Sequence, residues 1–233
     1  MVKQHLKRLA SPRTWPIEKK RLTFVARPNP GPHKLEQQVP IVVLLRDVLK
    51  VADTAKEVKY ILHNKDCLID GAVCHDEKRP VGIMDVLSLP KLKKQYRLLV
   101  NNRNTLTVVE VPAKEASTKI TKVIGKSTLK GGKVQLNCFD GRNFIIDKKT
   151  DAAVGDSIVT ELPAQKIVDT LKLQKGSTIM IDAGSHVGKT GLVESVEDEV
   201  ITVKVAEGEL FRTKKEYAIV IGKSKPLITL LNK

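Results

Sequence analysis

The residues whose types and spacing come closest to a catalytic motif lie at 183–190, where the chain reads Ala-Gly-Ser-His-Val-Gly-Lys-Thr. This order nearly spells the phosphate-binding loop of nucleotide hydrolases, with Ala183 in place of the first glycine. Such a loop requires a strand before it and a long helix after it, because the helix N-terminus faces the phosphates. The apolar run 178–181 predicts the strand, but Gly191 follows at once and residues 192–196 alternate as a second strand would. The pattern therefore predicts strand, glycine loop and strand, and it disfavours a P-loop NTPase.

The other chemistry-bearing residues form no catalytic or metal-binding set. Three cysteines leave at least one unpaired, no Cys-x-x-Cys pair occurs, and the five histidines are scattered. Cys67 and Cys74 flank an Asp-Gly turn and could face each other, but small buried thiols in a reducing cytoplasm are the favoured interpretation. Residues 105–233 offer no nucleophile–base pair or cofactor motif. We expect no cofactor, no metal and no small-molecule substrate.

Charge is concentrated at the start of the chain, which carries a net charge of +15 overall. Residues 1–34 hold nine Lys and Arg against Glu18 alone, a net +8, whereas residues 105–233 hold 20 against 16 Asp and Glu. A polyanion is the natural partner of such a front end. Aromatic residues make up only 3% of the chain, too few for gripping single strands by base stacking. Phosphate and shape contacts with a folded RNA are therefore the expected mode of binding.

Membrane and secretory functions are not indicated. The longest apolar run, 41–45, is far shorter than the roughly 20 residues that cross a bilayer. The basic N-terminus lacks the apolar segment of a secretory signal, and its prolines disfavour an amphipathic transit peptide. We expect a cytoplasmic protein that does not contact membranes.

The first 40 residues show no sustained periodicity and contain many prolines, each of which favours extended backbone before it. They are interpreted as an extended basic arm that becomes ordered only on a partner; a mobile tail without a function is the alternative. Trp15 weighs against the tail, because a tryptophan there would be exposed, and we expect it to anchor the arm on protein or RNA.

Residues 41–73 predict two short helices followed by a tight hairpin. Ile41, Leu44, Leu45 and Val48 share one helical face. Thr54 and Glu57 have capping-box spacing at the start of the second helix, and Asn64 is a plausible terminator. Asp70-Gly71 predicts the hairpin turn. Basic residues at helical spacing lie on the outward side, where they are either ordinary solvated charges or phosphate contacts: Arg46, Lys50, Lys56, Lys59 and Lys65.

The rest of the chain predicts mostly short strands. A hairpin is expected over 96–111, with an edge lined by Lys91, Lys93, Lys94, Arg97 and Arg103, which either protect an open strand or contact RNA. From 120 to 169 the strands form a small β domain in which 120–124 ends at Gly125, and a structural spacer is the favoured role. Residues 175–221 supply about five more strands around the 183–190 loop, whose tip would carry His186 and Lys189.

Three parts of this pattern resemble known domains or families. The order helix, turn, capped helix and hairpin over 41–104 resembles the S4-type RNA-binding domain, and Gly184, Gly188 and Gly191 around the loop resemble the KOW motif of SH3-like barrels. The segments His-Leu-Lys-Arg-Leu-Ala at 5–10, Pro-Gly-Pro-His at 30–33, Leu-Leu-Arg-Asp-Val-Leu at 44–49, Pro-Val-Gly-Ile-Met-Asp-Val at 80–86 and Gly-Gly-Lys-Val-Gln-Leu-Asn at 131–137 are similar, in order, to the ribosomal protein family S4e, in its short archaeal form.

The family resemblance implies a non-enzymatic small-subunit ribosomal protein that binds rRNA and neighbouring ribosomal proteins. The implied fold is α+β and mostly β: an arm at 1–40, an S4-like domain at 41–104, a central β domain at 105–172 and a KOW-containing SH3-like barrel at 173–233. An RNA-modifying enzyme with an appended S4-like domain is the alternative. Beyond the helix residues named above and Lys93, Lys94, Arg97 and Arg103 of the edge, the rRNA-contacting residues are expected to be Lys3, Lys7, Arg8, Arg13, Lys19, Lys20, Arg21, Arg27, His33 and Lys34.

Overall fold

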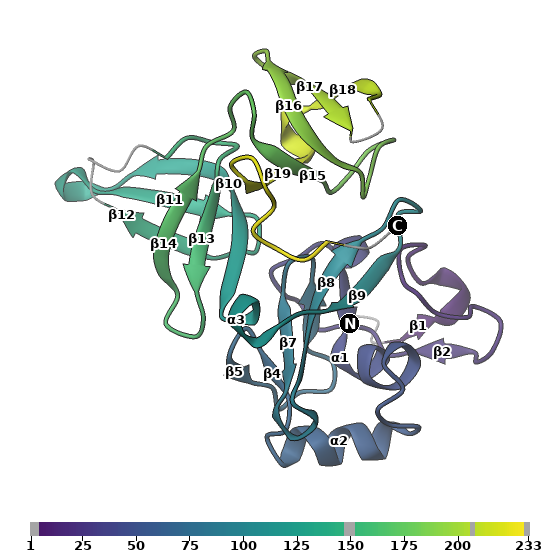
Figure 1. Cartoon of the computed structure of the whole chain (residues 1–233). Helices are drawn as coiled ribbons and strands as arrows, with labels where there is room; N and C mark the ends of the chain where they lie inside the picture. The colour runs from purple at the N-terminus through teal and green to yellow at the C-terminus, as the bar shows by residue number, and fades with distance from the viewer. Residues whose placement is uncertain (1–4, 147–151, 206–207, 231–233) are drawn as a thin grey trace. The chain divides into compact units, whose positions relative to one another are not determined.

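The computed structural model describes residues 5–146, 152–205 and 208–230 (Figure 1). The chain divides into two compact units, residues 1–99 with 105–117 and residues 100–104 with 118–233. Strands dominate both units, which agrees with the mostly β composition predicted from the sequence. No helix in these ranges is long and apolar enough to cross a membrane.

The helices of unit 1 form where the apolar spacing and the cap predict them. The first begins directly after Pro40 and buries Ile41, Leu44 and Leu45. The second is fixed by the predicted capping box, in which the Glu57 N–H donates to Thr54 Oγ1 over 3.3 Å. It ends at His63 with Asn64 as its C-cap, as expected, and Lys65 after the cap takes the left-handed conformation, with φ of 60°. The elements are α1 (Ile41–Val43), which continues as η3 (Leu44–Val48), and α2 (Ala55–His63).

A five-stranded sheet follows the helices, with the order β5-β4-β7-β8-β9. The predicted turn at Asp70-Gly71 is confirmed, since both residues have positive φ, 51° and 77°. Asp70 also accepts a hydrogen bond from the Val86 N–H over 2.9 Å, which fixes the hairpin on the next strand. The predicted hairpin near 101–104 is confirmed as well. The strands are β4 (Leu68–Ile69), β5 (Ala72–Val73), β7 (Val86–Leu89), β8 (Lys94–Val100) and β9 (Leu106–Glu110), with η4 (Pro90–Leu92) and α3 (Ala113–Ala116) beside them.

The N-terminal segment packs against its own unit. Trp15 is 2% exposed and its indole N–H donates to the Leu35 carbonyl over 3.3 Å. This corrects the expectation that the arm is ordered only on a partner, and it shows that Trp15 anchors the segment on protein. Residues 1–4 lie outside the described ranges. The segment's elements are β1 (Leu6–Lys7) paired with β2 (Phe24–Val25), β3 (Gln38–Pro40) paired with β6 (Pro80–Gly82), η1 (Arg8–Ala10) and η2 (Leu35–Gln37).

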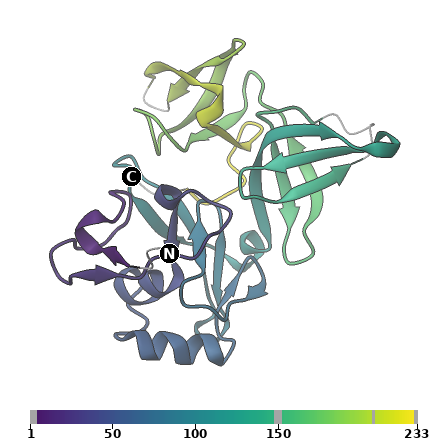
Figure 2. The same ribbon diagram turned by 180° about the vertical axis from the view of Figure 1, so that it is seen from behind.

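The first sheet of unit 2 has the order β12-β11-β10-β13-β14. Figure 2 shows β10 to β12 in front of β13 and β14. The strand β10 belongs to both layers, because residues 118–122 pair with β13 and residues 123–128 pair with β11. Val134, Leu136 and Cys138 point into the core, as their alternation predicts. The prediction that a strand ends at Gly125 is wrong: β10 runs on through a bulge at Ile124 and pairs beyond it with β11. The strands are β10 (Thr118–Thr128), β11 (Val134–Cys138), β12 (Asn143–Ile146), β13 (Ser157–Glu161) and β14 (Lys166–Leu171), with η5 (Lys130–Gly132) between β10 and β11.

The second sheet of unit 2 contains the five predicted strands in the order β18-β17-β16-β15-β19. Two hydrogen bonds join it to the first sheet: the Val220 N–H donates to Ser157 Oγ over 3.0 Å, and Lys122 Nζ donates to the Lys215 carbonyl over 3.2 Å. Burial lowers the pKa of Lys122, whose side chain serves this junction and is withdrawn from solvent. The strands are β15 (Thr178–Ile181), β16 (Thr190–Val196), β17 (Val200–Val205), β18 (Leu210–Lys214) and β19 (Ala218–Gly222), with η6 (Lys215–Tyr217) before β19.

Candidate nucleic-acid interface

The glycine loop at 183–190 has the architecture of a strand connection. β16 begins at Thr190, so the residue that would coordinate a nucleotide's metal in a phosphate-binding loop starts a strand. Gly184 and Gly188 have φ of 88° and 76°, as glycine permits. Gly191 is needed for a different reason, because a Cβ there would lie 2.6 Å from the Lys204 carbonyl oxygen. The sequence prediction of strand, loop and strand is confirmed.

A small aromatic and basic cluster lies beside this loop. The His186 ring stacks on Phe211 with centroids 4.2 Å apart, and Lys189 Nζ lies 5.7 Å from the Phe211 centroid. Glu209 approaches Lys189 to 3.9 Å. Both predicted loop residues are half-buried on the neighbouring strand rather than extended into solvent. Phe211 was not predicted as their partner, although it is the aromatic residue of the alternating strand β18.

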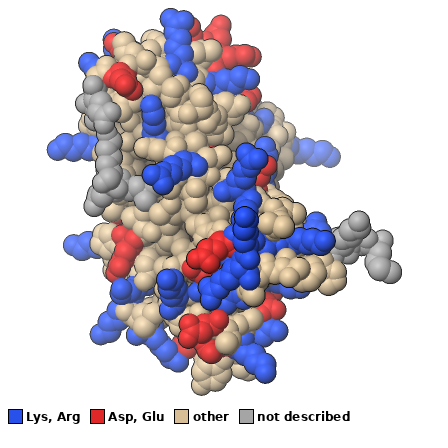
Figure 3. Space-filling model, turned by 90° about the vertical axis from the view of Figure 1, so that its right-hand side faces the viewer, with Lys and Arg blue, Asp and Glu red and all other residues tan. Residues whose placement is uncertain are grey.

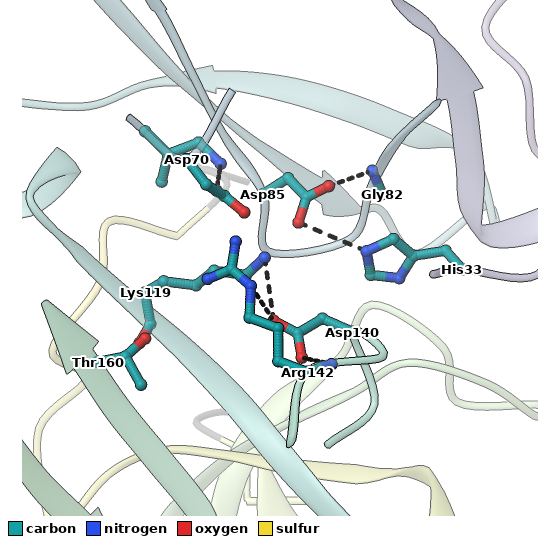
Figure 4. Close-up of polar contacts among 9 residues, drawn as sticks. His33, Asp70, Gly82, Asp85, Lys119, Asp140, Arg142 and Thr160 are labelled. Atoms are coloured by element: carbon teal, nitrogen blue, oxygen red, sulfur yellow. Dashed lines mark hydrogen bonds and ion pairs between the residues drawn. The ribbon is translucent and has the colours of Figure 1, made fainter. Parts of the chain in front are cut away.

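Three residues that were predicted to contact RNA are buried within unit 1, so the expectation that they face RNA is wrong. Arg8 is 1% exposed and its guanidinium lies 3.5 Å from the carboxylate of Asp47. His33 is 6% exposed, with Nε2 3.4 Å from Asp85 Oδ1 (Figure 4). Their carboxylate partners lie far away in sequence, so the charge pattern alone gave no sign of the pairing.

Arg97 is the third buried residue, and it pairs with Glu115 over 2.5 Å. Burial lowers the pKa of its guanidinium, while the Glu115 carboxylate acts in the opposite direction. Removing the carboxylate partner of a buried arginine leaves an uncompensated buried charge, so the pair is part of the fold, and the buried guanidinium is withdrawn from phosphates in solution.

The exposed basic residues of unit 1 fall into two groups. On the helices, Lys50, Lys56 and Lys65 are exposed and form no ion pair within the described part of the chain. Arg46 is half-buried beside Asp47 at 2.8 Å, and Lys59 lies 3.4 Å from Glu77. Exposed pairs of this kind contribute little to stability.

The second group follows the N-terminal segment and the β8 edge. Figure 3 shows Lys and Arg side chains gathered on the face where β1 and β2 lie in Figure 1, with Asp and Glu interspersed. Lys19 is half-buried and donates to the Ser11 carbonyl over 3.1 Å, and Lys94 pairs with Glu110 over 3.7 Å. Lys3 lies outside the described residues. The other predicted residues of this group are exposed: Lys7, Arg13, Lys20, Arg21, Arg27, Lys34, Lys93 and Arg103.

Buried acidic residues hold loops in both units (Figure 4). In unit 1, Asp85 Oδ2 accepts from the Gly82 N–H over 2.7 Å. In unit 2, Asp140 lies 3.2 Å from Lys119 Nζ and 3.5 Å from Arg142 Nε. These carboxylates are engaged with backbone donors and cations, which assigns them to fold stability.

The thiols of Cys67, Cys74 and Cys138 are free and buried. Burial raises the pKa of Cys67 to about 12, so this thiol stays protonated at neutral pH. Among the described residues, no group of His, Cys, Asp and Glu is arranged to hold a metal ion.

The fold and the surface define a basic, mostly β protein with exposed cations and a few buried ion pairs. Comparison with known proteins identifies its family. The model of ribosomal family S4e matches residues 92–167, and the RS4NT domain model matches residues 2–36. A small ribosomal subunit protein eS4 of Korarchaeum cryptofilum is 39% identical over 97% of both chains, and that of Methanosphaera stadtmanae is 37% identical over 98% of this chain and 96% of the relative.

Structural comparison agrees. The crystal structure of the 30S ribosomal protein S4e from Thermoplasma acidophilum superposes with a TM-score of 0.70 and 34% identity, covering 81% of this chain and 96% of that one. The chain belongs to the ribosomal protein S4e family. This family is structural, so the chain is not an enzyme, and the alternatives of an RNA-modifying enzyme and an NTPase are set aside.

Proposed function

We propose that the chain is a structural constituent of the small ribosomal subunit that binds small-subunit rRNA through phosphate and shape contacts. The observation that carries this proposal is the 37% to 39% sequence identity between this chain and small-subunit eS4 proteins over nearly their whole length. A ribosomal protein of this kind works in the cytoplasm, on the ribosome.

The distribution of exposed charge supports the phosphate contacts. The net +8 of residues 1–34 includes buried Arg8, but most of the remaining cations are on the surface. Lys20 and Arg21 are adjacent and exposed, and neither forms an ion pair with another described residue. Their release of counterions from RNA would contribute directly to affinity.

Residues 41–104 are proposed to act as an S4-like domain whose helices present Lys50, Lys56 and Lys65 to the RNA. Residues 173–233 are proposed to act as a KOW-type barrel. Its cluster of His186, Lys189 and Phe211 is suited to a second RNA segment or a neighbouring ribosomal protein, because a stacked aromatic pair and a cation contact both kinds of partner.

Salt-dependent binding tests the phosphate contacts. The full chain is titrated with transcribed small-subunit rRNA fragments between roughly 50 and 200 mM salt, where an electrostatic complex loses affinity steeply. The double variant Lys20→Gln/Arg21→Gln should reduce the slope of log K against log salt by about 1.5, since each lost phosphate contact removes roughly 0.7 to 0.9.

A matched control removes the same charge from cations that already have carboxylate partners. Lys91 lies 2.5 Å from Asp66, and Lys223 lies 3.1 Å from Asp169. The double variant Lys91→Gln/Lys223→Gln should change the slope much less. An affinity of the unmodified chain that stays flat across this salt range would exclude phosphate binding.

A further inference from the structure

The outward side of β10, β11 and β12 carries a row of neutral polar side chains. Along β11 the residues alternate, so Val134, Leu136 and Cys138 enter the core while Gln135 and Asn137 point the other way. By the same alternation Lys133 lies on the outward side. The register places Gly125 and Ser127 beside these residues on β10, and Asn143 and Ile145 beside them on β12. These seven residues are called the amide face, and Figure 2 shows their strands in front of β13 and β14.

The amides of this face are held in order and remain accessible. Gln135 Nε2 donates to Asn137 Oδ1 over 2.8 Å, which aligns the two side chains along the strand. A primary amide has two donor hydrogens and two acceptor lone pairs, so one bond leaves both side chains with unused capacity. Asn143 is exposed and Ile145 is 61% exposed. Gly125 and Ser127 keep the β10 side of the face low.

The surroundings of the amide face carry one sign of charge. The sole carboxylate between residues 118 and 146 is Asp140, which is 4% exposed and paired with Lys119 and Arg142. The exposed ionised groups in this stretch are lysines. Lys133 is on the outward side and Lys130 lies near its end, whereas Lys126 is opposite core-facing Leu136 and donates to the Ala152 carbonyl over 3.0 Å. The layer formed by β13 and β14 is mixed in charge: it exposes Glu161 opposite Lys166, and Asp169, which pairs with Lys223 over 3.1 Å. The strands of the amide face therefore expose lysines without exposed carboxylates, whereas β13 and β14 expose both signs.

We propose that the amide face docks on the minor groove of double-helical RNA. The RNA minor groove is wide and shallow, and it displays 2′-hydroxyl groups and base edges that both donate and accept hydrogen bonds. Gln135, Asn137 and Asn143 match this mixture, and Ile145 would lie against ribose. Lys130 and Lys133 at one end of the strands would reach the flanking phosphates.

The dimensions and the composition favour RNA over a protein partner. Lys133 and Asn137 are about 14 Å apart along the strand, and the three strands span about 10 Å, which suits a shallow groove. The core of a protein interface is typically apolar and aromatic, whereas Ile145 is the one large apolar side chain among the seven residues of the face, with Ile124 of β10 exposed beside them. The inference rests on the proposed rRNA-binding function and assigns part of it to the central sheet.

The first test exchanges the amides for carboxylates of the same shape. The full-length variant Gln135→Glu/Asn137→Asp should bind rRNA fragments at least about tenfold more weakly, the size expected from two lost hydrogen bonds and added repulsion. The matched control Gln165→Glu/Gln174→Glu adds the same charge at exposed positions away from the face. Equal affinities of the two variants would overturn the assignment of the face.

The second test locates the RNA. Cys67, Cys74 and Cys138 are buried, so Ile145→Cys supplies an accessible thiol for an iron chelate that cleaves nearby RNA. Cleavage of both strands of one helix is the expected result. Absence of cleavage in a complex that still forms would overturn the inference. A variant of the amide face that binds RNA normally but fails to enter the small subunit would also overturn it, because a protein would then occupy the face. If the unmodified chain binds no rRNA, the proposed function itself fails.

Discussion

Replacing Gly82 with alanine tests how the N-terminal segment is fixed to unit 1. Gly82 closes the short strand β6, and its φ is not in the left-handed region, so alanine is tolerated by the backbone. The obstacle is steric, because an added Cβ would lie 2.0 Å from Cδ2 of the His33 ring. His33 is buried and faces Asp85, which also accepts the Gly82 N–H.

The expected destabilisation follows from these contacts. Overpacking a well-packed site costs about 1 to 3 kcal/mol. Displacing the His33 ring also loses its interaction with Asp85, which adds about 1 kcal/mol. We expect Gly82→Ala to lower the free energy of unfolding of unit 1 by about 3 kcal/mol. With a urea dependence near 2 kcal/mol per molar, the midpoint should fall by about 1.5 M.

Tryptophan fluorescence provides the assay. Trp15 is the single tryptophan of the chain and is buried in unit 1, so its emission reports the unfolding of that unit. The control is Gly125→Ala, where the nearest atom to an added Cβ is Asn137 Nδ2 at 3.4 Å, a tolerable contact. Because Gly125 lies in unit 2, that variant should leave the Trp15 transition of unit 1 unchanged, and circular dichroism should show a loss within about 0.5 kcal/mol for the chain.

Two results would refute the steric reasoning. The first is a Gly82→Ala variant as stable as Gly125→Ala. The second concerns His33→Ala, which removes the ring and should make the Gly82→Ala substitution much less costly in the double variant. Additive losses in the double variant would show that the clash with His33 is not the cause.

Further predictions concern buried and capping charges. Glu115→Ala leaves the guanidinium of Arg97 buried without its carboxylate and should cost about 3 to 5 kcal/mol in the same unfolding assay; a loss below about 1 kcal/mol would place Arg97 in contact with water. Hydrogen bonds, chiefly from the Asp53 N–H, lower the pKa of Glu57 below its ordinary 4.5. The stability from the ionised carboxylate is therefore complete above pH 4.5 and lost as the pH falls through the folded-state pKa; thermal unfolding between pH 6 and 3 should show this loss relative to Glu57→Gln, and parallel curves would contradict it. Cys67, with its pKa raised to about 12, should resist alkylation at pH 8 until urea unfolds the chain, and rapid labelling in the native state would disprove its burial.

Local sequence rules predicted the elements whose causes are local. The capping box at Thr54, the Asp70-Gly71 turn and the alternation of Val134, Leu136 and Cys138 each depend on residues within a few positions, and each is present in the structure. The same rules were wrong at Gly125, because a bulge lets a strand continue through a glycine when a partner strand pairs beyond it.

The candidate site was predicted less completely than the fold. Charge and spacing identified Lys20, Arg21 and Lys56 as surface cations, but they also selected Arg8 and Arg97. A cation looks the same in a sequence whether its partner is water or a buried carboxylate 18 or 39 positions away. The amide face could not be predicted from the sequence either, because it forms only when three strands pair in register.

By itself the sequence determined the basic character, the family and the alternation of the strands, because composition, motif order and side-chain period are properties of the chain read in one dimension. Only the tertiary structure decided which charged side chains are buried in ion pairs and which remain exposed on the surface. Desolvation and ion pairing depend on neighbours that folding brings together from distant parts of the chain.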